Sequence, residues 1–247
     1  MKRLKIAIVG LTACSGCQLS LLNCEAELPE LLNLIDFSLF PLACSPAVIE
    51  GDYDAVLVEG CVSMPQEHEL LKNLRKRSRY LIAIGTCSVC GGVASIRNGE
   101  GREMLMRQVY GDSCPVGESH DPLPLHAVVS VDAVLSGCPP EKGELLNMLT
   151  GLLHGVLPES IDYPVCNDCR MNEHLCLLTE RGQLCLGLIT KGGCGARCPG
   201  LGVPCEGCRG PAMEPNLPEA RAIYRKHGCD EATVLERMRR FCPEWLP

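Results

Sequence analysis

Residues 4–17 read LKIAIVGLTACSGC, an apolar run followed by a loop that carries the motif Cys14-Ser-Gly-Cys17. A continuous apolar run of this length is typical of a strand buried on both faces, as the strands of parallel sheets are. Ligand sites of such sheets lie at the carboxyl ends of the strands. The stretch therefore predicts a parallel α/β fold whose first strand presents two thiols at the functional edge of the sheet.

The alternation of apolar runs and helical patterns continues to about residue 155. Further strands are expected at 35–40, 55–59, 80–84 and within 127–134, and helices at 18–33, 65–77, 103–108 and 141–153. Strands that alternate with helices predict right-handed crossovers and a sheet covered on both faces. We therefore expect residues 1–157 to form one doubly wound α/β domain.

Two more cysteines follow strands of this predicted sheet. Cys87 comes after the strand at 80–84, and Cys138 comes after the strand within 127–134. The fold should bring both to the edge that carries Cys14 and Cys17, because the carboxyl ends of parallel strands share one edge. Four thiolates are the ligand set of a [4Fe–4S] cluster, so we expect a cluster at these four cysteines, the core set.

Eight further cysteines crowd into a stretch rich in proline and glycine. By proximity they form two groups of four, the 166–185 set (Cys166, Cys169, Cys176 and Cys185) and the 194–208 set (Cys194, Cys198, Cys205 and Cys208). Such a stretch is not expected to build a large hydrophobic core, and bound clusters would supply folding free energy instead. Residues 158–247 are therefore predicted to form an irregular, cysteine-rich domain that holds two more [4Fe–4S] clusters.

Several alternatives to this ligand assignment stay open. The two tail sets could exchange a ligand, and His174 could replace a cysteine, since imidazole can ligate an iron–sulfur iron. Cys61 and Cys90 lie close to the core set in the predicted fold and could compete for it. Zinc also takes four thiolates, although three sets in one chain favour clusters.

The remaining cysteines are expected to be small buried apolar residues. They are Cys24, Cys44, Cys114, Cys229 and Cys242. Disulfides are not expected, because the start of the chain carries no recognisable export signal and the compartment should then be the reducing cytoplasm.

The net charge and the hydropathy of the chain argue against nucleic acid as a partner and against a membrane-spanning segment. The 247 residues carry a formal net charge of −7, which argues against nucleic acid because phosphate binding needs a basic face. No run approaches the roughly 18 apolar residues of a membrane span. A helical pattern over 217–241 is rich in arginine and is expected to be either a solvated face or a docking site for an acidic partner.

Glu59 ends the third predicted strand, at the same edge as the core set. Two interpretations stay open. The carboxylate is either a solvated strand end or a buried group that hydrogen-bonds the loops and relays a proton.

Together these motifs resemble the small subunit of a [NiFe] hydrogenase. The core motifs are Cys14-Ser-Gly-Cys17, Glu59-Gly60, Gly85-Thr86-Cys87 and Gly137-Cys138-Pro139-Pro140, and the cluster subunit of respiratory complex I, its 20 kDa subunit, shares them. The tail motifs Cys194-Gly-Ala-Arg-Cys198 and Cys205-Glu-Gly-Cys208 are similar to those of the cytoplasmic methyl-viologen-reducing (F420-non-reducing) hydrogenases of methanogens and their relatives.

The resemblance implies a flavodoxin-like domain with a proximal cluster at the core set. It further implies a medial cluster at the 194–208 set and a distal cluster at the 166–185 set. A cysteine at Cys198, where many relatives have proline, implies four irons in the medial cluster. Gln18 stands where exported relatives usually have a proton-transferring glutamate, so a proton route would have to use Glu59 or the partner.

The resemblance also implies the partners. The nickel–iron centre belongs to a separate large subunit in this family, so this chain is expected to carry electrons and no catalytic residue. The implied acceptor is a small [2Fe–2S] protein that leads to heterodisulfide reductase. A nickel-free, complex I-like electron-transfer complex and a zinc-stapled structural protein are the competing hypotheses.

Overall fold

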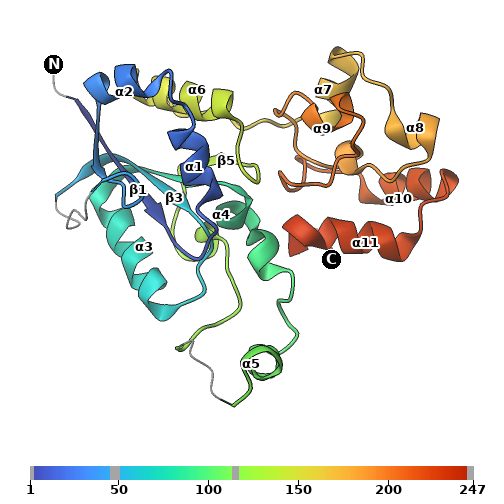
Figure 1. The fold of residues 1–247 in the computed structure, drawn as a ribbon, viewed down its shortest axis with the longest axis horizontal. Coiled ribbons are helices and arrows are strands. Elements are labelled where there is room, and N and C mark those ends of the chain that lie inside the picture. The colour runs from blue at the N-terminus through green and yellow to red at the C-terminus, as the bar shows by residue number, and fades with distance from the viewer. Residues whose placement is uncertain (1–2, 45–50, 113–116, 244–247) are drawn as a thin grey trace.

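The computed structural model describes residues 3–44, 51–112 and 117–243. Five parallel strands form one sheet in the order β2-β1-β3-β4-β5, which is the flavodoxin-like order and confirms the predicted fold class (Figure 1). The strands are β1 (Leu4–Gly10), β2 (Ile35–Leu39), β3 (Tyr53–Glu59), β4 (Ser78–Ile84) and β5 (Ala133–Leu135).

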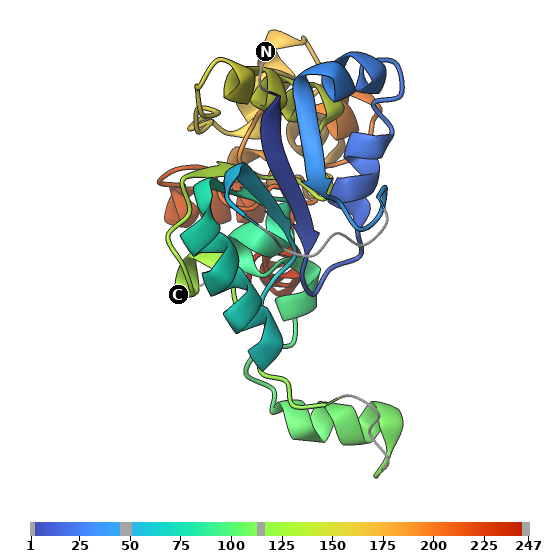
Figure 2. The same ribbon diagram turned by 90° about the vertical axis from the view of Figure 1, so that its left-hand side faces the viewer.

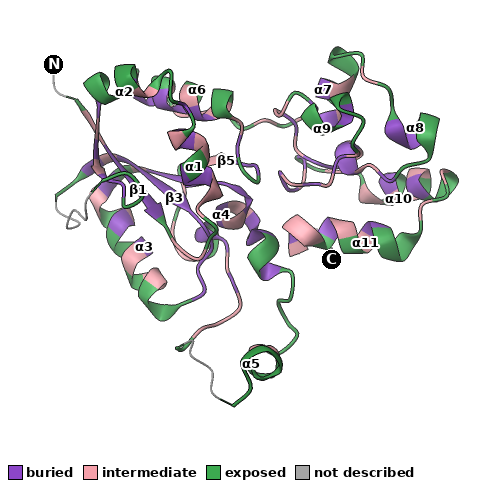
Figure 3. Ribbon diagram, in the orientation of Figure 1, coloured by how far each residue is buried: buried purple, intermediate pink, exposed green. Residues whose placement is uncertain are grey.

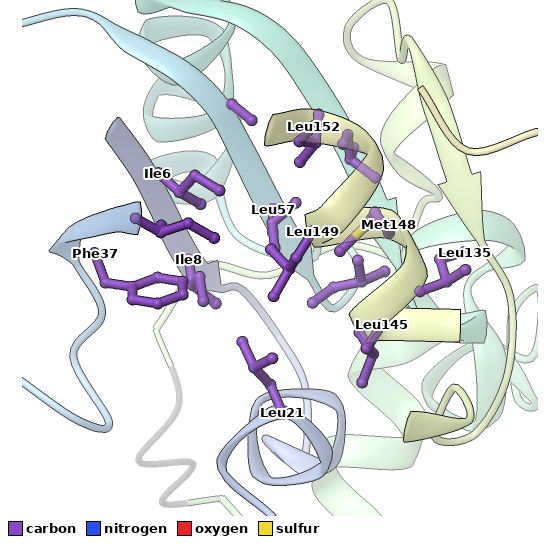
Figure 4. Packing of buried hydrophobic residues seen from close by; sticks show 14 of the residues in the cluster. Ile6, Ile8, Leu21, Phe37, Leu57, Leu135, Leu145, Met148, Leu149 and Leu152 are labelled. Carbon is purple, nitrogen blue, oxygen red and sulfur yellow. The ribbon is translucent and has the colours of Figure 1, made fainter. Parts of the chain in front are cut away.

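Helices cover both faces of this sheet (Figure 2). Helices α1 (Gly16–Leu22), α2 (Leu28–Leu34) and α6 (Lys142–Leu153) pack on one face, where Ile6, Ile8 and Leu57 meet Leu145 and Leu149 (Figure 4). The other face is covered by α3 (Pro65–Arg77) and a short 3-10 turn, η2 (Leu125–Ala127). Alternate residues of each central strand enter the two cores, which explains why these strands read as continuously apolar.

Two predicted helices are each broken in the structure. The pattern at 18–33 becomes α1 and α2, and the pattern at 217–241 becomes α10 (Leu217–Lys226) and α11 (Glu231–Phe241). The second break follows from Gly228, which has a φ of +75°, and from Asp230, whose side chain accepts a hydrogen bond from the Thr233 N–H and caps α11.

Two helices follow β4. The short helix α4 (Thr86–Cys90) begins at the strand's end and was not anticipated from the sequence, so Cys87 lies in a helix rather than in a loop. The helix α5 (Arg102–Tyr110) projects from the rest of the chain and has no buried residue among those described (Figures 2 and 3).

The tail after residue 158 consists of short helices and turns. They are α7 (Val165–Met171), α8 (Leu177–Arg181), η3 (Leu186–Leu188) and α9 (Arg197–Gly200), followed by α10 and α11. The tail builds a modest hydrophobic core after all, because Leu186 and Ile189 pack against Tyr224 of α10 and Met238 of α11. The boundary between 157 and 158 stays a prediction. Among the described residues, no helix has the length and apolar character needed to cross a bilayer.

Candidate functional site

The structure brings the four cysteines of the core set to the carboxyl edge of the sheet. Cys14 and Cys17 follow β1, Cys87 follows β4 and Cys138 follows β5, and these strands are parallel. Loop-to-loop hydrogen bonds hold the edge together: the Thr86 N–H donates to the Gly137 carbonyl at 2.9 Å. The predicted convergence of these four residues therefore has a structural basis.

Thiols of the core set lie within electrostatic reach of one another. Burial raises the pKa of Cys17, and Glu59, Cys87 and Cys138 raise it further. Burial also raises the pKa of Cys138, and Cys87 and Cys14 add to this effect. Four thiolates could not coexist here without a compensating positive charge, which the iron of a cluster supplies.

Glycines leave room around these sulfur atoms. A Cβ atom added at Gly85 would stand 2.3 Å from the Cys17 Sγ, and one at Gly92 would stand 2.6 Å from the Cys87 Sγ. The backbone N–H groups of Val93 and Ala94 act on the Cys87 thiol and lower its pKa, although burial and the Cys14 thiol outweigh them. Donor type, spacing and N–H groups directed at sulfur all fit an iron–sulfur cluster.

Glu59 is buried, with 2% of its surface exposed, so the interpretation of a solvated strand end is wrong. Its two carboxylate oxygens accept three hydrogen bonds, from the Cys17 N–H at 3.0 Å, the Gln18 N–H at 3.2 Å and the Gln18 Nε2 at 3.0 Å. Glu59 thus fixes the start of α1, where the loop with Cys14 and Cys17 turns into the helix. Its proton-relay role stays a prediction.

The 166–185 set gathers around α7, α8 and η3. Burial raises the pKa of Cys166 to about 12, with further increases from Cys185, Cys169 and Cys176. Gly187 lies beside two of these thiols, because its Cβ position is 3.5 Å from the Cys166 Sγ and 3.7 Å from the Cys185 Sγ. These mutual effects match the predicted grouping of the four residues.

Cys176 differs from its neighbours. Burial raises its pKa, but hydrogen bonds from the side chain and the backbone N–H of Thr179 reverse the direction, so the net pKa is lowered. The first turn of α8 therefore favours the thiolate form that a metal ligand requires.

The 194–208 set wraps the glycine-rich loop around α9. Burial raises the pKa of Cys208 to about 11, and Cys194 and Cys198 raise it while the backbone N–H of Cys138 lowers it. Burial likewise raises the pKa of Cys205, opposed by the Gly207 N–H. Cys205 departs from the predicted grouping, because Cys185 of the 166–185 set raises its pKa more than Cys208 does. The effect of Cys138 on Cys208 comes from the core set.

A buried cation that the sequence-based analysis did not single out lies beside this set. Arg209 directly follows Cys208, and its guanidinium forms a bidentate ion pair with Glu144 of α6 at 2.7 and 2.6 Å. Burial lowers the pKa of Arg209, but Glu144 raises it more, so the side chain stays charged. The sequence feature that could have pointed to Arg209 is its place directly after a predicted ligand cysteine in a glycine-rich loop.

The residues that could compete with the predicted cluster ligands lie in different parts of the structure. Burial raises the pKa of Cys61 to about 12, followed by an increase from Cys87, so Cys61 lies within electrostatic reach of the core set. Cys90 faces the tail instead, since its Sγ lies 3.4 Å from the Phe241 carbonyl oxygen. His174 is half-buried with its ring against Gly200, and Cys114 lies outside the described residues.

All cysteines in the described part of the chain carry free thiols. Across residues 3–44, 51–112 and 117–243, no three side chains of histidine, cysteine, aspartate or glutamate are placed as a site for a single metal ion. The division of the tail cysteines into two sets stays a prediction, because the Cys185 thiol raises the pKa of both Cys166 and Cys205.

The arginine-rich tail helices are partly paired within the chain. Glu206, between Cys205 and Cys208, forms ion pairs with Arg237 at 3.0 Å and Arg240 at 2.9 Å. Two basic residues of the predicted patch are therefore paired with the segment that carries Cys205 and Cys208, and their side chains stay partly exposed. The other basic residues of the patch are Arg221, Arg225, Lys226 and Arg239.

Comparison with known proteins identifies the class. A model of the family described as NADH ubiquinone oxidoreductase, 20 Kd subunit, matches residues 14–152. Sulfhydrogenase 2 subunit delta of Pyrococcus furiosus is 37% identical over 238 residues, which covers 96% of this chain and 99% of the relative. A vhu subunit of the F420-non-reducing hydrogenase of Methanocaldococcus jannaschii is 31% identical over 235 residues, with 83% of this chain and 81% of the relative covered.

Among solved structures, a chain of an NAD+-reducing [NiFe]-hydrogenase in the H2-reduced state has 31% sequence identity and a TM-score of 0.56. The match covers 64% of this chain and 95% of that chain. The chain therefore belongs to the family of the 20 kDa subunit of NADH ubiquinone oxidoreductase, and within it to the [NiFe] hydrogenase small subunits. The sequence-based identification of an oxidoreductase subunit of this kind is confirmed.

Proposed function

We propose that this chain is the electron-transfer subunit of a cytoplasmic [NiFe] hydrogenase and relays electrons from H2 oxidation in the large subunit to a separate acceptor. The observation that carries this proposal is the convergence of Cys14, Cys17, Cys87 and Cys138 at one edge of a flavodoxin-like sheet. The relatives from Pyrococcus furiosus and Methanocaldococcus jannaschii are named as hydrogenase subunits, which supports the same assignment.

The proposal assigns three [4Fe–4S] clusters, one to each set of four cysteines. Residues 1–157 would hold the proximal cluster at the core set, and residues 158–247 the medial cluster at the 194–208 set and the distal cluster at the 166–185 set. When bound, such clusters supply one-electron transfer at potentials set by hydrogen bonds and burial. The chain contributes thiolates, N–H donors and the Arg209 charge, which together stabilise and position the bound groups.

The partners follow from the same assignment. The large subunit would hold the nickel–iron site and face the core set, and the acceptor would be a small [2Fe–2S] protein that leads to heterodisulfide reductase. The similarity to a subunit of an F420-non-reducing hydrogenase is consistent with an acceptor other than F420. The net charge of −7 is consistent with a partner other than nucleic acid.

Metal analysis of the complex, purified without oxygen, tests the proposal. We expect about twelve irons with matching acid-labile sulfide per chain, together with nickel in the large partner. Iron and sulfide without nickel would favour the complex I-like alternative. Zinc without sulfide would exclude electron transfer by this chain.

A single substitution tests the core set. Cys138→Ser should lower the iron content of the complex and weaken the electron paramagnetic resonance (EPR) signal of the cluster nearest the large subunit. Cys24→Ser is the control, because the Cys24 thiol belongs to none of the three sets and donates to the Ser20 carbonyl of the preceding helix, α1. Unchanged hydrogen-dependent dye reduction in Cys138→Ser would count against the assignment.

A further inference from the structure

Hydrogen bonds connect each cysteine set to the next. The Thr86 hydroxyl, next to Cys87 of the core set, donates to the Cys208 carbonyl of the 194–208 set, and we call this contact the inner junction. The Cys205 backbone N–H of that same set donates to the Cys185 Sγ of the 166–185 set at 3.2 Å, and we call this contact the outer junction.

The outer junction has a second hydrogen bond beside the first. At the outer junction the Leu186 N–H donates to the Cys205 carbonyl at 2.9 Å, so the pair is made entirely of backbone and ligand atoms. At the inner junction the Cys208 carbonyl accepts its hydrogen bond from the Thr86 hydroxyl. The inner junction is thus the one that depends on a side chain other than a cysteine.

Thr86 occupies a central position at this junction. It is 2% exposed, it directly precedes Cys87, and its hydroxyl also accepts a hydrogen bond from the Gly137 N–H at 3.2 Å. Its own N–H donates to the Gly137 carbonyl at 2.9 Å. One side chain therefore ties together the residues adjacent to Cys87 and Cys138 and the backbone of Cys208.

We propose that Thr86 is a positioning residue that holds the backbone of Cys208 against the residues next to Cys87 and Cys138, and so keeps the core set and the 194–208 set close together for electron transfer. This inference rests on the proposed function. The electron would leave the cluster held by the core set and enter the cluster held by the 194–208 set, so no proton, bond or further reactant is involved. The methyl group and Cβ of Thr86 cannot form hydrogen bonds, so the bond to the Cys208 carbonyl depends on the hydroxyl.

Three variants of the complex, purified with its large subunit, separate positioning from folding. Thr86→Val removes the hydroxyl at nearly constant volume, and Thr86→Ser keeps it. Ser88→Ala is the matched control, because Ser88 is another buried hydroxyl of α4 but bonds the Ile84 and Gly85 carbonyls of its own segment. All three are expected to keep the iron and sulfide content of the parent complex.

The readout is the passage of single electrons injected at the core set by flash photoreduction and detected at the tail by rapid-freeze EPR. We expect Thr86→Val to slow this passage about fivefold, which corresponds to about 1 kcal/mol for one net hydrogen bond. The magnetic interaction between the reduced core and tail clusters should weaken in the same variant. Thr86→Ser and Ser88→Ala should match the parent complex in both measurements.

The outcomes separate the two proposals. Full iron content with equal passage rates in Thr86→Val and the parent would overturn the role of Thr86 and leave the proposed function intact. A Thr86→Val complex that lost iron would also overturn it, because Thr86 would then be required to build a site rather than to connect two. A parent complex without iron and sulfide would overturn the proposed function itself.

Discussion

Gly85 lies directly against Cys17, so that a Cβ atom at Gly85 would stand 2.3 Å from the Cys17 Sγ. Gly85 has a φ of +84° and links the end of β4 to α4, the helix that carries Cys87. A side chain there could only be accommodated if the Cys17 sulfur moved. Because Gly85 lies against Cys17 and directly precedes the helix of Cys87, the positions of these two cysteines depend on each other.

We expect Gly85→Ala to disrupt the core set, whereas Gly99→Ala should not. Gly99 has nearly the same φ, +83°, but nothing lies within 4 Å of its Cβ position. Both variants should lose about 1–2 kcal/mol because a left-handed backbone disfavours alanine. Only Gly85→Ala should also lose about four irons per chain, measured by iron and sulfide analysis. Equal iron contents in the two variants would contradict the steric argument.

Glu59→Gln should weaken the loop that carries Cys14 and Cys17. The carboxylate accepts three N–H groups, whereas a glutamine offers one oxygen and turns its NH2 group toward a donor. The expected loss is about 1–3 kcal/mol in the free energy of unfolding, measured by anaerobic urea titration, together with a lower iron content. Glu69→Gln is the control, since Glu69 is 79% exposed and pairs only with Lys72. Equal stability of the two variants would show that Glu59 is not structurally engaged.

The core set could be predicted from the sequence because it depends on topology alone. Once strands end at Gly10, Ile84 and Leu135, the parallel sheet fixes the edge where the cysteines that follow must lie. The breaks between α1 and α2 and between α10 and α11 were not predicted from the sequence. Capping residues and glycines that end a helix are weak local signals within a longer helical pattern.

Contacts between the sheet and the tail could not be predicted. The pairs Thr86–Cys208 and Arg209–Glu144 join residues that are far apart in the chain, and nothing in either local sequence specifies its partner. The burial of Glu59 is a similar case. A strand-end carboxylate is exposed or buried according to which loop folds over it, and here that loop is the start of α1.

His68 should make stability fall at acidic pH. Burial lowers the pKa of His68, and the neighbouring His120, whose Nε2 lies 2.9 Å from the His68 Nε2, lowers it further. Lys72 acts in the same direction, while Glu69 and Glu67 oppose it. The unfolded chain then binds the proton more tightly, so this contribution to stability is complete above about pH 6.5 and is lost as the pH falls below it.

We therefore expect the apparent Tm to drop between about pH 7 and pH 5.5, and His68→Gln to reduce the size of that drop. His126→Gln is the control, because His126 is exposed and lies outside this pair. Thermal unfolding at several pH values measures the effect. The same slope in His68→Gln and in the unmodified chain would contradict the assignment.

Arg209 and Glu144 should stabilise the attachment of the tail to the sheet domain. Their side chains are only 3% and 15% exposed, so removal of one partner leaves a buried charge without compensation. Glu144→Gln is expected to cost about 3–5 kcal/mol. Glu141→Gln, which affects the pair of the partly exposed Glu141 with the exposed Arg197 at 3.5 Å, should cost about 1 kcal/mol or less.

A double substitution distinguishes the loss of this ion pair from the loss of packing. In Glu144→Leu with Arg209→Met no buried charge remains, so much of the stability lost in Glu144→Gln should return, because apolar residues of similar volume can replace a buried pair. The Arg209 charge beside Cys194 and Cys208 is absent only in the double variant, so the reduction potential of the 194–208 set should be lower there than in the parent. Urea unfolding and an EPR-monitored redox titration of the same sample measure the two effects separately. A double variant as unstable as Glu144→Gln would show that the guanidinium contributes through packing rather than through charge.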